Sequence, residues 1–253
     1  MDQPVQAVRR NEMDKQTDTD RLAQRIRRQF NKGCVDYRLL ADGDRILVAL
    51  SGGKDSLMLV RLLAKRARIH RPSIAVEAAH VVMDNIPYET DTTWLEDYCS
   101  ALGIRLHILH ARFDETSDPR RTRCFLCART RRRTLLSYAV DKGFNKLALG
   151  HHMDDILTTF LMNITFEGST STMPPLLPLD HYPVSIIRPM CLVHEDLVGQ
   201  LAIHLDFARQ KRTCPYEEVT QRAVMRQELR RLEAINPEAR YSMWQAIQKH
   251  FDR

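Results

Sequence analysis

The sequence predicts an α/β fold with a mainly parallel, twisted sheet and helices on both of its faces. Short apolar runs alternate with segments of helical periodicity from Arg45 onward, and repeated units of this kind are typical of parallel sheets. The first apolar run continues through a Gly-Gly turn straight into a helical segment, and no internal repeat interrupts the pattern. The 253 residues are enough for one large domain of this class with smaller elements at its ends.

The expected strands are short apolar runs, and the expected helices are segments that carry an apolar stripe. The first strand follows a turn at Asp42-Gly43-Asp44, and the helix after it places Leu57 and Val60 on one face. A long loop is expected at 165–183, where Ser, Thr and Pro dominate. Strands are expected at 45–50, 74–82, 105–109, 146–149 and 186–187, and helices at 56–67, 92–102, 130–142 and 154–163.

The two ends of the chain differ from this alternating region. The first 20 residues are polar and lack an apolar period, whereas Leu22, Ile26 and Phe30 further on share one face of a helix rich in arginine. The tail is helical in composition and breaks at Asn236-Pro237. We therefore expect a flexible N-terminal arm at 1–20, a basic helix and linker at 21–44, a sheet domain at 45–205 and a C-terminal helical segment at 206–253.

Composition and charge are typical of a folded globular protein, and the modest positive charge favours a polyanionic binding partner. Hydrophobic residues make up 43% and charged residues 28% of the chain, and the net charge is +6. No apolar stretch approaches the roughly 20 residues that cross a bilayer, and the start lacks the layout of a secretory signal. A cytoplasmic protein without membrane attachment is expected, in which the six cysteines serve as core thiols or metal ligands rather than disulfides.

A phosphate-binding loop is predicted between the first strand and the first helix. Two adjacent glycines let the backbone turn tightly and present N–H groups to an anion, and the helix adds the positive end of its dipole. The lysine directly after the glycines excludes a Walker A loop and would neutralise phosphate oxygens. An ordinary capped Gly-Gly turn is the alternative. The residues of this phosphate loop are Ser51, Gly52, Gly53, Lys54, Asp55 and Ser56.

A second polar segment, residues 150–155, stands at the end of the strand expected at 146–149. Ligands in open α/β sheets lie beyond the carboxyl ends of the strands, so this His-Asp loop and the phosphate loop should face the same crevice. Gly150 and His151 would lie near the nucleotide, while Asp154 and Asp155 could reach a Mg²⁺ ion on the phosphates. Helix capping by Asp154 is the alternative. Asp84 stands after the second strand, at the same sheet edge, where an acidic residue is often a simple turn residue.

A cysteine pair, Cys124 and Cys127, has the two-residue spacing of metal ligands. Two thiolates do not close a site, and Cys214 is the best distant candidate because it precedes a proline in a polar segment. Three cysteines could hold a 4Fe-4S cluster with one open iron, and an added histidine would permit zinc instead. Cys99 and Cys191 are expected to be buried thiols, and Cys34 is left without a role.

The phosphate loop resembles the PP-loop of the ATP pyrophosphatases, enzymes that leave AMP on an oxygen of their substrate and release pyrophosphate. The resemblance runs from about Arg45 to Met190 and implies an adenine nucleotide alpha hydrolase-like fold, with Asp84 on the adenosine side of the bound nucleotide. The cysteine pair, the Gly-His-His-x-Asp-Asp pattern and a later Met173-Pro-Pro segment are most similar to the tRNA 2-thiocytidine synthetases. That branch implies cluster ligands at Cys124, Cys127 and Cys214, and catalytic residues at Lys54, Asp55, Asp154 and Asp155. One departure is that Cys214 here lacks the second Cys-x-x-Cys of many relatives.

Seven arginines and no acidic residue occupy positions 120–133, the densest run of charge in the chain. Guanidinium groups pair with phosphates and stack on bases, so this arginine run predicts an RNA-binding surface beside the cysteine pair. A solvated helix face is the alternative. The predicted RNA contacts are Arg121, Arg123, Arg129, Arg131, Arg132 and Arg133.

The resemblance, together with these observations, implies an ATP-dependent tRNA thiolation enzyme that adenylates a base carbonyl, with cytidine C2 as the expected position. Its expected cofactors are ATP, Mg²⁺ and a 4Fe-4S cluster, and its partners are tRNA and a sulfur donor, either a cysteine desulfurase or inorganic sulfide. A homodimer is compatible with the sequence. Two alternatives stay open: a lysidine synthetase-like ligase with a structural zinc, and an RNA-binding protein that senses nucleotides without catalysis.

Overall fold

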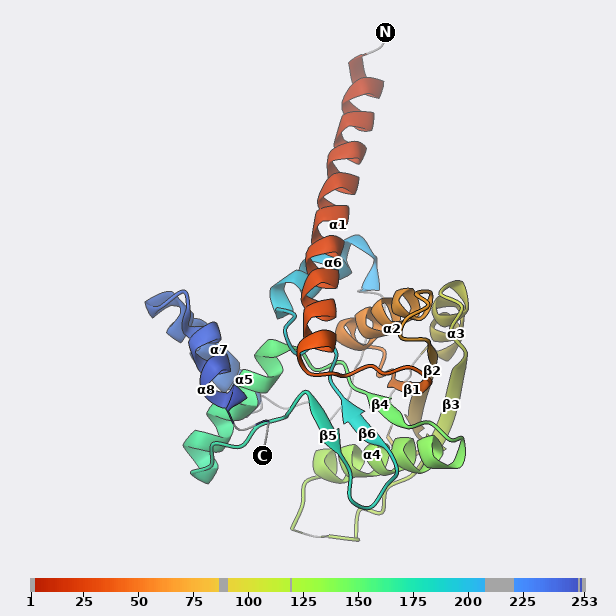
Figure 1. Cartoon of the computed structure of the whole chain (residues 1–253), viewed down its shortest axis with the longest axis vertical. Coiled ribbons are helices and arrows are strands. Elements are labelled where there is room, and N and C mark those ends of the chain that lie inside the picture. The colour runs from red at the N-terminus through yellow and green to blue at the C-terminus, as the bar shows by residue number, and fades with distance from the viewer. Residues whose placement is uncertain (1–2, 87–90, 119, 208–220, 250, 252–253) are drawn as a thin grey trace.

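The computed structural model describes residues 3–86, 91–118, 120–207, 221–249 and 251. Its centre is a six-stranded sheet with the order β3-β2-β1-β4-β6-β5, in which every neighbouring pair is parallel except β5 and β6 (Figure 1). The predicted mainly parallel α/β fold is therefore confirmed. The strands are β1 (Asp44–Ala49), β2 (Ile74–Met83), β3 (Leu106–Ala111), β4 (Lys146–Ala148), β5 (Leu176–Pro178) and β6 (Ser185–Ile187).

Alternating side chains of β1 build the layers on the two faces of the sheet. Ile46 and Val48 face a core shared with α1 (Gln3–Asp36), α2 (Lys54–Ala67), α3 (Thr92–Ala101) and α6 (Glu195–His204). Leu47 faces the opposite way, against α4 (Arg123–Asp141). Both sets of side chains are buried, so the strand is apolar throughout, as expected for a parallel strand covered on both sides. Figure 1 shows α2 and α3 on one side of the sheet and α4 on the other.

Within the sheet domain, three elements differ from the sequence prediction. β5 lies within the expected loop at 165–183, because its pairing with β6 makes a short antiparallel edge. α6 was not predicted, and its buried residues Leu197, Val198 and Leu201 pack against α1 and α2. α4 begins at Arg123 rather than near 130, because the Thr122 side chain accepts a hydrogen bond from the Phe125 N–H and caps an earlier turn.

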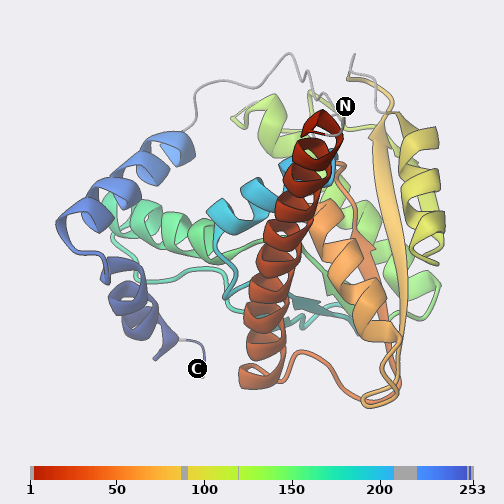
Figure 2. The ribbon, with the colours of Figure 1, turned by 90° about the horizontal axis from the view of Figure 1, so that it is seen from above.

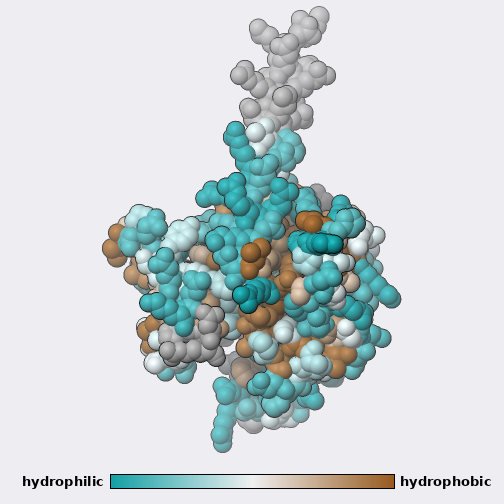
Figure 3. Space-filling model, in the orientation of Figure 1, coloured by the Kyte–Doolittle hydropathy of each residue, from teal (hydrophilic) through white to brown (hydrophobic). Residues whose placement is uncertain are grey.

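Helix α1 is longer than the sequence predicted, since it begins at Gln3 and not at Arg21. A proline near its start and no glycine before Gly33 allow the helix to continue through the polar residues. Its last third is anchored by Ile26 and Phe30, which are fully buried, and the remainder projects beyond the sheet domain (Figure 1). The part of α1 that is coloured in Figure 3 is mostly hydrophilic on its visible face. The flexibility of residues 1–20 and the domain bounds stay predictions.

The C-terminal segment forms α7 (Gln221–Ile235) and α8 (Ala239–Gln248), which are separated near Asn236-Pro237 as predicted. Both helices pack against α5 (Met153–Met162), where Ile156 and Leu157 meet Leu229 and Trp244. α5 continues into a short π-helical segment, η1 (Asn163–Glu167). Figure 2 shows α7 and α8 beside α5, at one side of the sheet domain. This contact brings the C-terminal helices to the end of the His-Asp loop.

Candidate active site

The phosphate loop and the His-Asp loop touch each other at the carboxyl edge of the sheet. They follow β1 and β4, which are parallel neighbours. A Cβ atom added to Gly150 would lie 3.1 Å from the Ser56 backbone nitrogen and 3.2 Å from the Asp55 carbonyl oxygen. The expected convergence of the two loops is thus observed, and Gly150 permits it because it has no side chain.

Gly150→Ala should weaken ATP binding by about tenfold, because the added methyl group meets backbone atoms and forces the phosphate loop to shift by a few tenths of an ångström. Gly199→Ala on α6 is the matched control, since a Cβ there meets no atom within 4 Å and alanine favours a helix. Calorimetric titration with ATP measures both variants. Equal ATP affinity in Gly150→Ala and the natural protein would contradict the loop contact.

The phosphate loop is closed by its own hydrogen bonds and leaves the start of α2 uncapped. Gly52 has a φ of +81°, a conformation that glycine adopts without strain. The Ser51 N–H donates to Ser56 Oγ at 3.1 Å, and Ser56 Oγ donates to the Gly53 carbonyl oxygen at 2.9 Å. No side chain caps α2 at Gly53, so its first N–H groups remain available to an anion. This geometry suits the predicted phosphate cradle.

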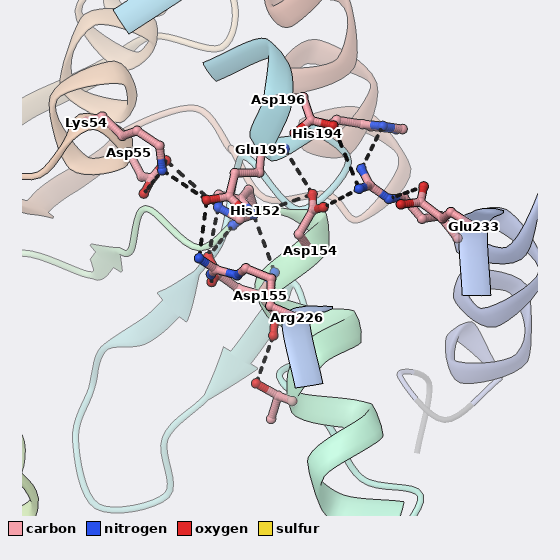
Figure 4. A network of polar contacts seen from close by, with 12 residues as sticks. Lys54, Asp55, His152, Asp154, Asp155, His194, Glu195, Asp196, Arg226 and Glu233 are labelled. Atoms are coloured by element: carbon pink, nitrogen blue, oxygen red, sulfur yellow. Dashed lines mark hydrogen bonds and ion pairs between the residues drawn. The ribbon is translucent and has the colours of Figure 1, made fainter. Parts of the chain in front are cut away.

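Lys54, the first residue of α2, is held by two carboxylates beside the loop (Figure 4). Its Nζ lies 3.1 Å from both oxygens of Asp55 and 3.2 Å from Glu195 Oε1. Burial alone would lower the pKa of Lys54, but the charges of Asp55 and Glu195 outweigh it and raise the pKa. Lys54 is therefore a fixed positive charge at the mouth of the phosphate loop.

Glu195 and Arg226 complete an ion-pair chain that the sequence did not predict. Arg226 on α7 contacts Glu195 Oε1 at 3.2 Å and Asp155 Oδ1 at 2.8 Å, while Arg222, one turn earlier, lies 3.7 Å from the same Asp155 oxygen. The chain runs from Lys54 through Glu195 and Arg226 to Asp155, and so joins α2, α6, α7 and α5 (Figure 4). The only sequence signal was the i, i+4 spacing of the two arginines on a helix.

Asp154 points away from the phosphate loop and binds the C-terminal helices. Its Oδ1 accepts from Arg240 Nη2 at 2.9 Å, and its Oδ2 accepts from the Glu195 N–H at 2.9 Å. Both side chains are almost fully buried, so this pair is a structural clamp between α5, α6 and α8. In Figure 4, Asp154 lies on the side of Glu233, whereas Asp155 lies beside Arg226.

Asp155 takes part in a capping box with His152 at the start of α5. The His152 N–H donates to Asp155 Oδ2, and the Asp155 N–H donates to His152 Nδ1. Burial works against ionisation of Asp155, but the charges of His152, His151 and Arg226 together lower its pKa. Every oxygen of Asp154 and Asp155 is thereby engaged. In this arrangement the two carboxylates do not fit a resident Mg²⁺ ion, and no group of three metal-ligating side chains occurs among the described residues.

Acid should loosen the α7 contact more than it loosens the rest of the molecule. The pKa of Asp155 and of Glu195 is lowered, so their pairing stabilises the fold above the ordinary carboxyl range of about 4 and is lost as pH falls through the lowered values. Arg226→Met removes the ion pairs with Asp155 and Glu195 at every pH, so the stability that they provide is already absent at pH 7. Urea unfolding at pH 7 and at lower pH should show a smaller loss of unfolding free energy in Arg226→Met than in the natural protein, and equal losses would contradict the assignment.

Two further nucleotide candidates lie at the same sheet edge. His151 is half-buried beside Gly150, and burial together with the charge of Arg188 lowers its pKa to about 4, so the ring is neutral near pH 7. Asp84 follows β2 and is exposed, and its Oδ1 lies 2.8 Å from Nδ1 of His110, at the end of β3. The nucleotide-binding roles of both residues stay predictions.

The cysteine pair lies in the first turn of α4, also at the carboxyl edge of the sheet because α4 follows β3. Cys124 is exposed, and Cys127 is half-buried against the core between α4 and the sheet. An i, i+3 spacing places both thiols on one face of the helix, and the helix N-terminus favours the negative charge of thiolate ligands. The pair therefore fits a metal cluster that has further ligands elsewhere. Cys214, the predicted third ligand, lies outside the described residues.

The other three cysteines are buried, as predicted for Cys99 and Cys191. Burial raises the pKa of Cys34 to about 12 and that of Cys99 to about 11, and it also raises the pKa of Cys191. These thiols are protonated at neutral pH and so are poor metal ligands. Cys124 differs from them in being exposed, and Cys127 in being only half-buried.

The arginine run surrounds the cysteine pair, and its members differ in what they contact. Arg121 lies over the Phe125 ring at 4.7 Å, and Arg123 pairs with Glu115 at 2.9 Å. Arg131 is half-buried. Within the described part of the chain, no ion pair involves the exposed residues Arg129, Arg132 and Arg133.

Sheet and site together define a class of protein. It is an α/β nucleotide-binding protein in which the phosphate loop, the arginine run and the cysteine pair share one sheet edge. The sequence matches the model of the PP-loop domain family over residues 19–232. It is 34% identical over 250 residues to a tRNA-cytidine(32) 2-sulfurtransferase of Methylococcus capsulatus, covering 97% of this chain and 84% of that one. It is 36% identical over 191 residues to a tRNA-cytidine(32) 2-sulfurtransferase of Bdellovibrio bacteriovorus, covering 74% of this chain and 72% of the relative.

The fold is also similar to the solved structure of the U34-tRNA thiolase NcsA from Methanococcus maripaludis with its 4Fe-4S cluster. The TM-score is 0.76 at 25% sequence identity, over 93% of this chain and 80% of that chain. The chain therefore belongs to the PP-loop family, in the branch of the tRNA-cytidine(32) 2-sulfurtransferases. Among the described residues, no helix has both the length and the apolar character needed to span a membrane.

Proposed function

We propose that the protein is an ATP-dependent tRNA sulfurtransferase that adenylates the C2 carbonyl oxygen of a cytidine and replaces that oxygen with sulfur. The observation that carries the proposal is the contact between the phosphate loop and the His-Asp loop, on the sheet edge where the cysteine pair also lies. The names of the relatives, which are tRNA-cytidine(32) 2-sulfurtransferases, supply the base and its position. The adenylation chemistry follows from the PP-loop family.

The chain's own residues bind ATP and keep its phosphates in place. The uncapped N–H groups of α2 and the hydroxyl of Ser51 would hold phosphate oxygens, and Lys54 would neutralise their charge. Attack of the base oxygen on the α-phosphorus forms a C2–O–P bond and releases pyrophosphate. Sulfide then attacks C2, the C2–O bond breaks, and AMP leaves with the former base oxygen. Fixed positive charges at the phosphates stabilise the negative charge that develops in the first step.

Cys124, Cys127 and Cys214 would hold the iron–sulfur cluster. A 4Fe-4S cluster with three protein ligands supplies one open iron at which sulfide can bind. The surface position of Cys124 and Cys127 at the helix N-terminus suits this group. Mg²⁺ would enter with ATP, and because the oxygens of Asp154 and Asp155 are engaged, no step depends on an ion held by them. Inorganic sulfide or a cysteine desulfurase would donate the sulfur, and the reaction would take place in the cytoplasm, where tRNA and ATP are available.

The arginine run would hold the RNA beside the cysteine pair. Changing Arg131, Arg132 and Arg133 to glutamine should weaken tRNA binding and reduce the slope of its salt dependence by up to about 2, because fewer counterions are released. The control changes Arg45, Arg105 and Lys142, three cations that line one pocket at the opposite sheet edge. Filter binding over a range of salt concentrations measures both variants. Equal slopes in the two triple variants would return the run to a solvated helix face.

The proposed function is tested with anaerobically purified protein, ATP, sulfide and a transcribed tRNA that carries cytidine at position 32. Mass spectrometry of the digested tRNA should detect 2-thiocytidine only when ATP is present, with one AMP formed for each sulfur inserted. Metal analysis on the same sample should find iron and sulfide. Zinc together with an amine-modified base would support the lysidine synthetase-like alternative, and RNA binding without AMP formation would support the non-catalytic one.

A further inference from the structure

Arg188 is a buried cation without a buried counter-ion. It follows β6 at the carboxyl edge of the sheet, and only 6% of its surface is exposed. Its Nη1 donates to the Pro174 carbonyl oxygen at 2.5 Å and its Nε to His151 Nδ1 at 3.4 Å. Both acceptors are neutral, and within the described residues no carboxylate pairs with Arg188. Burial and the charge of Arg132 lower the pKa of Arg188 to about 10, which leaves it charged at neutral pH.

The contact with Arg188 also fixes the state of His151. Because His151 Nδ1 accepts a hydrogen bond, the neutral ring carries its proton on Nε2. Burial and the charge of Arg188 keep the pKa of His151 at about 4, so this neutral form prevails. Neither His151 Nε2 nor Arg188 Nη2 has a hydrogen-bond partner among the described residues. Two adjacent side chains thus offer N–H donors that protein acceptors leave unused.

This donor pair lies beside the phosphate loop, at the carboxyl edge of the sheet. His151 is next to Gly150, whose Cα lies against the phosphate loop. Arg132, on the arginine run, raises the positive potential at Arg188, and Arg222 on α7 does so at His151. Cations from α4, α7 and the end of β6 therefore lie near this donor pair. Asp155 balances part of the charge at His151 and pairs with Arg222, but within the described residues no carboxylate pairs with Arg188. Such an arrangement is costly unless an anion binds there.

We propose that Arg188 and His151 form a phosphate-binding site that is filled when substrate binds. The ligand is a phosphate group, either the α-phosphate of ATP or a backbone phosphate of the RNA. A guanidinium fork and a neutral imidazole N–H match phosphate oxygens in shape and charge. A purely structural role for Arg188 would be to support the Pro174 carbonyl, and that role does not require a positive charge. The proposal deepens the proposed function and rests on it for the identity of the two ligands.

The test compares Arg188→Met with Arg188→Lys, and Arg45→Met serves as the control. Methionine keeps much of the length of the side chain and removes the buried charge, which does not require the fold to change. Arg45 is exposed at the opposite edge of the sheet, where its guanidinium lies 5.1 Å from the Phe144 ring centre. Calorimetry measures the affinity for ATP with Mg²⁺, and filter binding measures the affinity for the transcribed tRNA at several salt concentrations. Thermal unfolding checks that each variant is folded.

Arg188→Met should weaken one of the two ligands by at least about tenfold, and Arg188→Lys should weaken the same ligand less, because it keeps the charge but loses the fork. A loss in the ATP arm identifies the nucleotide phosphate. A loss in the tRNA arm, with a salt slope smaller by about 1, identifies an RNA phosphate. Unchanged affinity for both ligands in a folded Arg188→Met or Arg188→Lys would overturn the site. Both arms measure binding alone, so failure of the natural protein to thiolate tRNA would remove the proposed function and leave this result standing.

Discussion

Lys54→Ala is expected to lower ATP-dependent formation of 2-thiocytidine by about 100- to 1,000-fold. Lys54 opens α2, and its charge is held at the phosphate loop by Asp55 and Glu195. ATP binding would bring a stronger anion to the same place, and the lysine would then neutralise the phosphate oxygens. Removing it takes a positive charge from the position where negative charge grows during adenylation. The fold should remain intact, because the Lys54 side chain is part of a partly exposed ion-pair chain and not of a hydrophobic core.

Product formation by Lys54→Ala is measured by mass spectrometry, with Lys65→Ala on the same helix as the control. Glu195→Gln separates a catalytic from a structural role for Lys54. It breaks the ion pair while leaving the lysine charge in place, so a purely structural role predicts that both variants lose activity to the same extent. We expect Glu195→Gln to retain far more activity than Lys54→Ala. Normal turnover by Lys54→Ala would remove the phosphate-loop assignment.

Cys124→Ser and Cys127→Ser should each lose most of the bound iron and bring thiolation down to background. A hydroxyl is a poor ligand for iron, and the two thiols share one face of the first turn of α4. Cys191→Ser is the matched control, because its thiol is buried and protonated and should hold no metal. Iron and sulfide are measured anaerobically in all variants, together with ATP affinity, which should change little.

Cys214→Ser tests the third ligand, which was predicted from the sequence alone. Loss of iron with normal ATP affinity would place Cys214 in the cluster. Full cluster occupancy in Cys214→Ser would exclude it, and loss of the cluster in Cys191→Ser would mean that a different distant cysteine is the ligand. Zinc in place of iron in the natural protein would contradict the sulfur-binding role of the site.

The sequence predicted the sheet, the phosphate loop and the His-Asp loop because each of these has a local signal. Apolar runs and the Gly-Gly turn are visible within a dozen residues, and five of the six described strands were anticipated. β5 was missed because Leu176–Pro178 is short and becomes a strand only by pairing with β6. α6 was missed because Gly199 and the β-branched Val198 weaken its helix propensity, and packing against α1 and α2 stabilises it instead.

The ion-pair chain could not be predicted, because its members are distant in sequence. Lys54 and Glu195 are 141 positions apart, and Asp155 and Arg226 are 71 apart. Nothing in the local pattern says which carboxylate an arginine will meet across the fold. Asp154 illustrates the difficulty: adjacent aspartates at a strand end suggest a metal site, but the first binds Arg240 and the second binds Arg226.

The central claim is that the base oxygen is activated by adenylation, and an isotope label tests it most directly. A tRNA is prepared with ¹⁸O at C2 of the target cytidine and incubated anaerobically with the protein, ATP and sulfide. Because the C2–O bond breaks after the C2–O–P bond has formed, mass spectrometry should find one ¹⁸O atom in the phosphate of each AMP released. AMP without the label, formed in step with 2-thiocytidine, would contradict the account.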